Sequence, residues 1–250
     1  MIELKTPGEI DTMRRAGRIV AGLLRHVSAA VKPGVRTREL DEASADYLRR
    51  AGATPAFLNY RGYPATLCVS VNEEVVHGIP GDRKLREGDL VSLDAGAVVD
   101  GLFADAAVTV PVGGVNAQAK RLSDTTKQAL DEGIAAAAAG RRLSDISHAV
   151  QQVVERAGFN VVRDFVGHGI GRALHEEPAV PNFGPPNVGP RLKPGMVLAI
   201  EPMVTMGGYE VRVLDDGWTV VTTDRSLAAH FEHTVAITEH GPEVLTEAGS

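Results

Sequence analysis

The feature that most constrains the fold is an internal repeat that relates the two halves of the 250-residue chain. Residues 34–52 and 140–158 match at a constant offset of 106 positions, and both segments end in Arg-Ala-Gly. Residues 88–94 resemble residues 195–201 at an offset of 107 positions. The near-constant offset indicates that the same structural unit occurs twice along the chain.

A third pair of segments extends the repeat, since residues 105–110 resemble residues 232–237. Chance similarity between short amphipathic segments is the alternative explanation, but four elements recur in the same order. We therefore infer two similar halves, roughly residues 6–112 and 123–240. Each half is expected to contain two helices followed by antiparallel strands.

Capping and periodicity signals define the expected elements. Thr6 can cap a helix, Pro7 fits its first turn, and Glu9 completes a capping box. We expect helices at residues 7–31, 37–50, 123–139 and 144–156. We expect strands at residues 66–71, 90–99, 102–110, 161–162, 197–201, 211–221 and 234–238. This order predicts an α+β fold.

The repeat superposes acidic residues that lie in apolar strands. Asp94 matches Glu201, and Asp105 matches Glu232. A lone charge in such a strand is costly to bury. Because side chains alternate along a strand, each acid shares a face with small or polar neighbours and lies opposite bulky ones. Small neighbours leave room for ions.

The dipeptide at positions 100 and 101 fixes how the first two acids meet. Asp100-Gly101 is a strong signal for a two-residue hairpin turn. That turn places Asp105 opposite Gly96, with Asp94 one diagonal step away on the same face. Carboxylates held about 5–8 Å apart repel unless a proton or a cation lies between them. A proton shared by an acid dyad is one possibility, but four acids favour a divalent metal.

Histidines decide which metals such a site prefers. His168 lies among glycines in Gly-His-Gly-Ile-Gly, and His175 begins His-Glu-Glu-Pro. His77 lies in His-Gly-Ile-Pro, which echoes the second site. Oxygen ligands alone suit magnesium or calcium, whereas a histidine favours manganese, iron, cobalt or zinc. The remaining helical or C-terminal histidines are read as structural or solvated: His26, His148 and His240.

Composition excludes several classes of function. The formal net charge of −6 argues against a basic surface that grips nucleic acid. Cys68 is the single cysteine, so no internal disulfide is possible. No apolar run reaches the roughly 18 residues that span a membrane, and residues 1–18 lack the pattern of a secretion signal. We therefore expect a cytoplasmic protein that does not enter a membrane.

Taken in order and spacing, the motifs identify a family. The chain resembles the type I methionine aminopeptidases over almost its whole length. The matching segments are residues 77–80, Asp94 with Asp105, residues 167–171, 175–178, 200–203 and 232–234. The resemblance implies the pita-bread fold of creatinases and aminopeptidases. In that fold two pseudo-symmetric halves form one catalytic domain, here residues 1–250, whose antiparallel sheet carries helices on its outer face.

The resemblance also implies a site with two divalent ions, either Co, Mn, Fe or Zn. Asp94 would chelate one ion, Asp105 and Glu232 would bridge both, and His168 and Glu201 would hold the second. A water or hydroxide that bridges the metals would attack the scissile carbonyl.

The resemblance assigns three catalytic groups as well. Glu201 would shuttle the proton. His175 would hydrogen-bond the developing oxyanion or the peptide, and His77 would assist the peptide nitrogen, so both also bind substrate.

The methionine pocket implied by the resemblance is apolar and aromatic. The corresponding positions are Phe57, Tyr60, Tyr63, Cys68, Leu174 and Trp218. Leu174 stands where the bacterial pattern commonly has Phe, and Phe57 where it commonly has Cys. His230-Phe231 stands where Gln-Tyr is common, with no evident cost to metal binding. Cys68 is expected to line the pocket without acting as a nucleophile.

These features imply an enzyme that removes the initiator methionine from nascent polypeptides, with a small second residue preferred. We expect a monomer that meets its substrates near the ribosome exit. An X-Pro peptidase with the same metal site is one alternative, although such enzymes usually carry an additional N-terminal domain. A non-catalytic binding protein on this fold is the other, although such proteins typically lose metal ligands.

Overall fold

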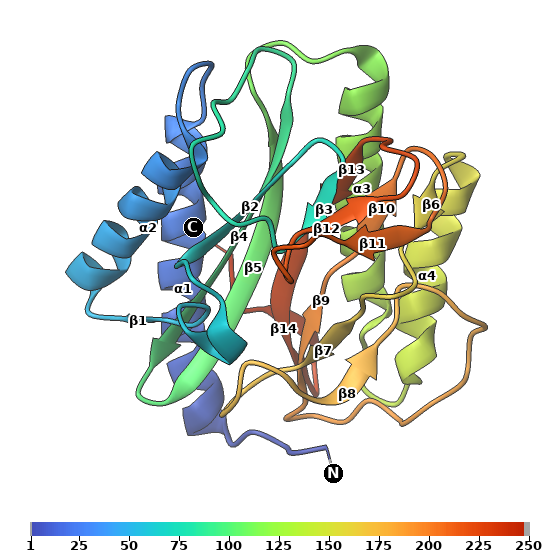
Figure 1. Cartoon of the computed structure of the whole chain (residues 1–250). Helices are drawn as coiled ribbons and strands as arrows, with labels where there is room; N and C mark the ends of the chain where they lie inside the picture. Colours follow the sequence, from blue (N-terminus) through green and yellow to red (C-terminus); the bar gives the residue numbers. More distant parts are fainter. Residues whose placement is uncertain (1, 248–250) are drawn as a thin grey trace.

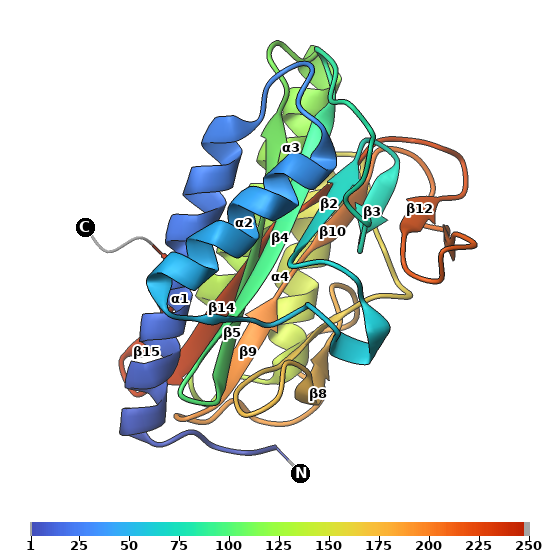
Figure 2. The same ribbon diagram turned by 60° about the vertical axis from the view of Figure 1, so that its left-hand side comes forward.

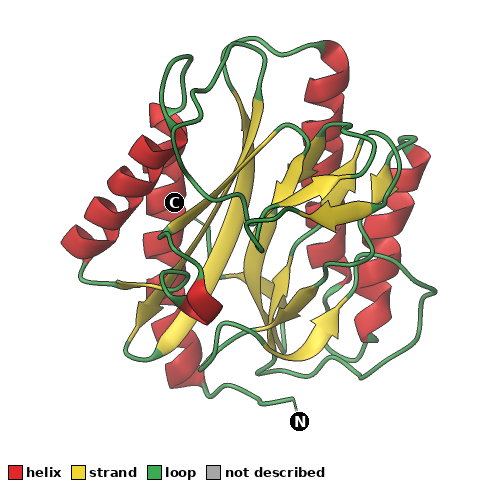
Figure 3. Ribbon diagram, viewed as in Figure 1, coloured by secondary structure: helices red, strands yellow, loops and turns green. Residues whose placement is uncertain are grey.

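The computed structural model describes residues 2–247 and shows two pairs of helices packed against a curved antiparallel sheet. The helices are α1 (Pro7–Ala30), α2 (Thr37–Ala51), α3 (Ala117–Ala136) and α4 (Leu143–Arg156). Figures 1 and 3 show α1 with α2 beside one part of the sheet and α3 with α4 beside the other. The predicted α+β class is confirmed. The predicted bounds 1–250 include residue 1 and residues 248–250, which lie outside the described residues.

Local caps fix the ends of the first two helices. The Thr6 hydroxyl accepts a hydrogen bond from the Glu9 backbone, and the Glu9 carboxylate accepts one from the Thr6 backbone at 2.8 Å. This is the predicted capping box. Helix α2 ends at Gly52, whose φ of 68° lies in the left-handed region that glycine adopts readily.

Among residues 2–247, no helix is both long and apolar enough to cross a bilayer.

Helix α3 begins six residues before the predicted start at position 123. Its cap is Asn116, whose side-chain oxygen accepts a hydrogen bond from the Ala119 backbone at 2.9 Å. The intervening residues favour a helix, and Lys120 pairs with Asp124 one turn later at 2.6 Å. At the other end Ala137 leaves helical geometry with a ψ of 46°, so the helix stops before the predicted residue 139.

The strands that carry the first two acids form one long hairpin. β4 (Leu90–Val99) pairs antiparallel with β5 (Leu102–Pro111), and Asp100 and Gly101 form the turn. Both turn residues have positive φ, 48° and 78°, as a type I′ turn requires. Asp105 lies opposite Gly96. The predicted hairpin and its register are confirmed.

A nine-stranded sheet within the described residues joins the two halves. β14 (Glu232–Thr238) pairs antiparallel with β5 on one side and with β9 (Val197–Ile200) on the other. The order continues through β7 (Gly167–Gly169) to β8 (Glu176–Val180), while β1 (Thr54–Pro55) and β2 (Leu67–Val71) flank β4 and β15 (Gly241–Val244) flanks β14. The acidic strands of both halves therefore lie in one continuous sheet.

Two small sheets complete the described fold. The single strand predicted at residues 211–221 is wrong, because this segment forms two strands of the second small sheet. The first contains β13 (Ala228–His230), β10 (Met203–Thr205) and β6 (Asn160–Val161). The second contains β11 (Val211–Val213), β12 (Val220–Thr222) and β3 (Glu74–Val76).

The predicted strand is a hairpin of β11 and β12. Asp216 accepts hydrogen bonds from the backbones of Trp218 and Thr219 at 2.9 and 2.8 Å, and Gly217 has a φ of 76°. These interactions close a turn in the middle of the segment.

The core lies between the helices and one face of the large sheet. Leu93 of β4 packs in a cluster with Leu23 of α1, and Leu198 of β9 packs with Leu130 of α3. All four side chains are almost fully buried. Figure 2 shows α1 and α2 covering the sheet near β4 and β5. Because side chains alternate, the acids of the same strands point to the opposite face.

Candidate metal centre

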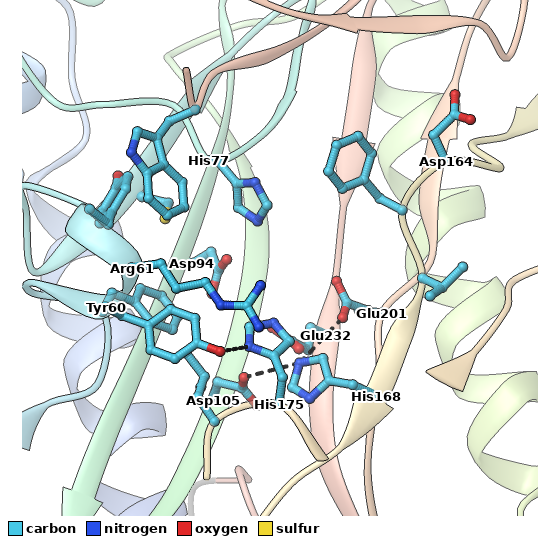
Figure 4. A pocket seen from close by; sticks show the side chains of 17 residues that line it. Tyr60, Arg61, His77, Asp94, Asp105, Asp164, His168, His175, Glu201 and Glu232 are labelled. Atoms are coloured by element: carbon cyan, nitrogen blue, oxygen red, sulfur yellow. Dashed lines mark hydrogen bonds and ion pairs between the residues drawn. The ribbon is translucent and has the colours of Figure 1, made fainter. Parts of the chain in front are cut away.

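The acidic face of the sheet borders a cavity of about 320 Å³. Its walls come from the hairpin β4–β5, from β14, from the end of β9, and from the loops around residues 57–63, 164–168 and 174–175. Figure 4 shows the carboxylates of the four strand acids and the His168 and His175 rings gathered around this space, whereas the carboxylate of Asp164 points away from them. Every residue that the sequence predicts for the site lines the cavity. They are Phe57, Tyr60, Tyr63, Cys68, His77, Asp94, Asp105, His168, Leu174, His175, Glu201, Trp218 and Glu232.

Strand register brings three of the four acids together. Ala107 of β5 lies opposite Asp94 on one side and opposite Glu232 on the other. Asp105 precedes Ala107 by two residues and therefore shares its face. The small side chain of Ala107 leaves space between the carboxylates, as the pattern of small neighbours predicts. The side chains of Asp105 and Glu232 are both buried.

The fourth acid, Glu201, directly follows β9. The Asn182 side-chain amide donates a hydrogen bond to the backbone carbonyl of Glu201 at 3.0 Å. This bond holds the main chain where it leaves the strand. The Glu201 side chain lines the cavity together with the other three carboxylates.

Burial raises the pKa of all four carboxyl groups. Burial is the main cause at Asp94, Glu201 and Glu232, and repulsion from the neighbouring acids adds to it. Burial also raises the pKa of Asp105, although a hydrogen bond from the Thr234 hydroxyl offsets part of the effect. Among residues 2–247, Asp94 Oδ1 is buried without a hydrogen-bond partner. Carboxylates so arranged ionise together only when a cation accompanies them.

His168 presents a free nitrogen to these acids. Its Nδ1 donates to the Gly169 carbonyl at 2.9 Å, so Nε2 carries the lone pair. Nε2 lies 3.6 Å from Asp105 Oδ2 and 3.6 Å from Glu201 Oε1. Burial lowers the pKa of His168 to about 4, which keeps the ring neutral near pH 7. A hydrogen bond from one ring nitrogen to a backbone carbonyl, which fixes the tautomer, is typical of histidines that bind metals.

Glycine is required beside His168 by close backbone contact. A Cβ on Gly167 would meet the Ala199 carbonyl oxygen, and a Cβ on Gly169 would meet that of Glu177. The Gly-His-Gly sequence therefore lets β7 lie flush between β8 and β9.

The donor set fits a divalent cation. Ligand atoms of Asp105, His168 and Glu232 all lie within 4.8 Å of one another, and all three residues are buried. Asp94 and Glu201 lie outside that group of three but line the same cavity. Hard carboxylate oxygens with one imidazole nitrogen suit manganese, iron, cobalt or zinc.

Two further imidazoles border the acids. The His175 ring lies 4.1 Å from the His168 ring, measured between centroids, and its Nδ1 lies 2.8 Å from the Tyr60 hydroxyl oxygen. His77 packs edge-on against Phe165 and Trp218. The pKa of each is lowered to about 4, mainly by burial, and at His77 the neighbouring His175 contributes to the shift. Both rings are therefore neutral near pH 7 and can donate one hydrogen bond and accept another.

The other end of the cavity is apolar. Tyr63 and Trp218 form an edge-to-face pair with centroids 5.1 Å apart. The Tyr63 hydroxyl donates toward the carbonyls of Leu67 and Gly78, so its ring is fixed. Burial raises the pKa of the Cys68 thiol well above its usual range, which makes it unreactive and fits the expectation of a lining residue.

The structure adds residues that the sequence analysis did not assign. Arg61, Asp164, Phe165 and Val166 also line the cavity. Arg61 lies in a single 3₁₀ turn (Tyr60–Gly62) and the other three lie in a loop, so no periodic sequence pattern singles them out. His230 is 1% exposed, and its Nε2 lies 3.5 Å from Glu201 Oε2. The sequence departure at position 230 was visible, but only the structure shows that this ring faces Glu201.

Comparison with known families covers nearly the whole chain. The profile of metallopeptidase family M24 matches residues 11–239. The methionine aminopeptidase 1 of Bacillus subtilis is 52% identical over 246 residues, which cover 98% of this chain and 99% of that protein. The methionine aminopeptidase of Clostridium perfringens is 53% identical over 246 residues, with the same coverage.

Solved structures agree with this match. The methionine aminopeptidase of Thermotoga maritima superposes with a TM-score of 0.97 at 50% identity, covering 99% of this chain and all of that one. The prolidase of Pyrococcus furiosus superposes with a TM-score of 0.80 at 24% identity, covering 99% of this chain and 66% of that one. The second likeness shows the fold alone. Together they confirm the predicted pita-bread fold.

Proposed function

Since the chain belongs to metallopeptidase family M24, we propose that it is a methionine aminopeptidase that removes the N-terminal methionine of new proteins. The predicted resemblance to that enzyme is confirmed by relatives that match over almost the entire chain. One observation carries the proposal furthest. A single cavity joins a buried cluster of carboxylates and imidazole to an apolar aromatic end.

We propose that two divalent ions bind at the acidic end. Asp105, His168 and Glu232 supply ligand atoms close enough to share one ion. Two further acids, Asp94 and Glu201, extend this donor set. Asp94 Oδ1 is buried and has no hydrogen-bond partner among the described residues. Bound divalent ions would supply Lewis acidity that polarises the scissile carbonyl and acidifies the attacking water.

The apolar end would hold the methionine side chain. A thioether packs favourably against aromatic rings and small apolar groups. Trp218, Tyr63, Cys68 and Leu174 supply such a surface, and Phe57 and Tyr60 extend it. Leu174 and Phe57 are buried and line this cavity, at positions where the common bacterial pattern has Phe and Cys.

Neutral histidines would handle the peptide bond. If the Tyr60 hydroxyl donates to His175 Nδ1, then His175 Nε2 carries a proton that can stabilise the developing oxyanion. His77 lies on the Trp218 side of the cavity, where it can hydrogen-bond the peptide nitrogen. A carboxylate oxygen of Glu201 would move the proton from the attacking water to the leaving nitrogen.

We also propose the setting in which the enzyme works. Its substrates would be nascent chains with a small second residue, met near the ribosome exit in the cytoplasm. The whole chain would form one catalytic domain, since strands of both halves share the sheet that carries the acids. We expect a monomer, because the exposed large apolar residues of the described chain, Leu4, Leu58, Val188 and Val213, lie in four different segments.

Four peptides test the proposed activity. Protein loaded with Mn²⁺ or Co²⁺ should release methionine from Met-Ala-Ser, but should not act on Leu-Ala-Ser, Met-Leu-Ser or Ala-Pro-Ser. A chelator should abolish the release. Cleavage of Ala-Pro-Ser instead would assign the chain to the X-Pro peptidases, and no cleavage with metal bound would favour a binding protein.

A matched pair of variants tests the metal assignment. Asp105→Asn should abolish activity because it removes a buried anionic ligand. Asp124→Asn makes the same change in an exposed helical ion pair and should leave activity intact. Full activity in Asp105→Asn would contradict the assigned site.

A further inference from the structure

His230 ends β13 and is held there by the neighbouring long strand. Its backbone N–H donates to the Thr109 hydroxyl at 2.9 Å, and that hydroxyl donates to the His230 carbonyl at 2.7 Å. Thr109 belongs to β5, the strand that also carries Asp105. The His230 backbone is therefore fixed relative to the metal centre, and its side chain is almost fully buried.

The imidazole of His230 faces the carboxylate of Glu201. Its Nε2 is buried and makes no hydrogen bond to any residue from 2 to 247. The atom lies 3.5 Å from Glu201 Oε2, just beyond hydrogen-bond distance, so a small rotation of either side chain would form the bond. Buried polar atoms in native proteins nearly always have partners, so an orphaned ring nitrogen aimed at a carboxylate calls for a role.

We propose that His230 is a positioning residue for Glu201, with its Nε2–H donating to Glu201 Oε2. The Nε2–H tautomer follows from the contact, because a lone pair facing a carboxylate would be repelled. With Oε2 held, Glu201 Oε1 faces His168 Nε2 across 3.6 Å, where a cation would bind. The inference rests on the proposed metallopeptidase function, since it assigns a task to a neighbour of that site.

The geometry favours positioning over direct ligation. His230 does not line the cavity, whereas Glu201 does. Asn182 fixes the Glu201 backbone. His230 supplies the second restraint, on the carboxylate itself, and such outer partners tune ligand orientation.

Three substitutions separate the hydrogen bond from the bulk of the ring. In His230→Gln the amide N–H is as many bonds from Cβ as His Nε2, so it can replace the donor. In His230→Asn the amide is one bond shorter and should not reach. His230→Leu removes the donor while keeping an apolar side chain. His233→Leu is the matched control, because this histidine lies two residues beyond Phe231 and its Nδ1 bonds the Thr246 hydroxyl instead.

Mn²⁺ affinity by calorimetry and steady-state cleavage of Met-Ala-Ser are the two readouts. We expect His230→Leu and His230→Asn to lose about 10–100-fold in Mn²⁺ affinity, with kcat falling and KM changing little. His230→Gln should return both quantities close to wild type, and His233→Leu should change neither. The visible spectrum of Co²⁺-loaded His230→Gln should match that of the wild type, because no ligand is exchanged.

Three results would overturn the inference. The first is a wild-type Mn²⁺ affinity and kcat in His230→Leu. The second is the same Mn²⁺ affinity and kcat in His230→Gln as in His230→Asn. The third is an altered Co²⁺ spectrum in His230→Gln, which would show that His230 is itself a metal ligand. If His230→Leu fails to fold, the comparison of Gln with Asn still decides. If the wild type binds Mn²⁺ but cleaves no peptide, the proposed function fails, while the affinity differences test the positioning role independently.

Discussion

A buried ion pair connects the N-terminal segment to the loop that carries His175, and its removal gives a quantitative test. Lys5 Nζ lies 2.6 Å from Glu176 Oε2, with side-chain exposures of 1% and 13%. The other oxygen of Glu176 accepts the backbone N–H groups of Arg172 and Ala173 at 2.7 and 3.1 Å. Glu176 therefore holds the loop that precedes His175 through these hydrogen bonds, and Lys5 neutralises the charge of the Glu176 carboxylate.

Lys5→Met keeps the length of the side chain and removes its charge. Loss of one partner from a buried pair typically costs about 3–5 kcal/mol. Because Glu176 keeps two backbone donors and is slightly exposed, we take the lower value, about 3 kcal/mol. At about 2–4 °C per kcal/mol for a protein of this size, Tm should fall by about 6–12 °C. The loop should also loosen, so kcat/KM for Met-Ala-Ser should fall even at temperatures where the variant is folded.

Urea unfolding followed by circular dichroism measures the stability change. Lys127→Met is the matched control, because Lys127 pairs with Asp131 at 3.0 Å in an exposed helical pair. That variant should lose at most about 0.5 kcal/mol. Adding Glu176→Gln to Lys5→Met should recover part of the loss, since no buried charge is then left unpaired. A loss in Lys5→Met no larger than in the control would refute the reasoning.

Four more perturbations follow from the site. Metal binding should release protons because the four buried acids have raised pKa values. Mn²⁺ titrations in two buffers of different ionisation enthalpy should therefore give different heats, and equal heats would contradict this. By the same linkage, the metal-free fold holds protons that the unfolded chain has lost. Its stability above pH 6.5 should fall as pH rises, by about 1.4 kcal/mol per pH unit for each retained proton, which a pH series of Tm values measures. Leu174→Ala truncates a buried side chain in the cavity wall and should lower kcat/KM for Met-Ala-Ser by about tenfold or more. An unchanged kcat/KM would show that Leu174 does not contact the methionine side chain of the substrate. Gly78→Ala should cost about 1–3 kcal/mol of stability and perturb His77, because a Cβ there meets the Val69 carbonyl, whereas Gly81→Ala has open space and should be silent.

Local rules were sufficient for the elements that place the first two acids. The Asp100-Gly101 turn and strand alternation together predict that Asp105 faces Gly96 and shares a face with Asp94, and the structure has that register. The predicted start of α3 at residue 123 was wrong, because the residues just before it also favour a helix and Asn116 caps the helix at its true start. Helix propensity alone does not locate the first residue of a helix when the preceding residues also favour a helix.

The role of His230 depends on contacts between segments far apart in sequence. Residues 230 and 232 would share a face if they lay on one continuous strand. In the structure the chain passes from β13 of a small sheet to β14 of the large one at Phe231. The ring of His230 meets Glu201 because β13 pairs with β10, which puts His230 opposite Met203, and because β14 pairs with β9. No local pattern records these pairings.

Strand alternation explains how one sheet tolerates such a destabilising site. On β4, Leu93 lies in the core beneath α1 while the next residue, Asp94, lies in the cavity. On β9, Ile200 lies in the core formed with α3 and α4, while Glu201 follows on the other side. Asp94 and Glu201 are thus each anchored by a buried neighbour on the opposite face, so their positions do not depend on their own favourable contacts. The strands can therefore keep the four carboxylates close together before a cation relieves their repulsion.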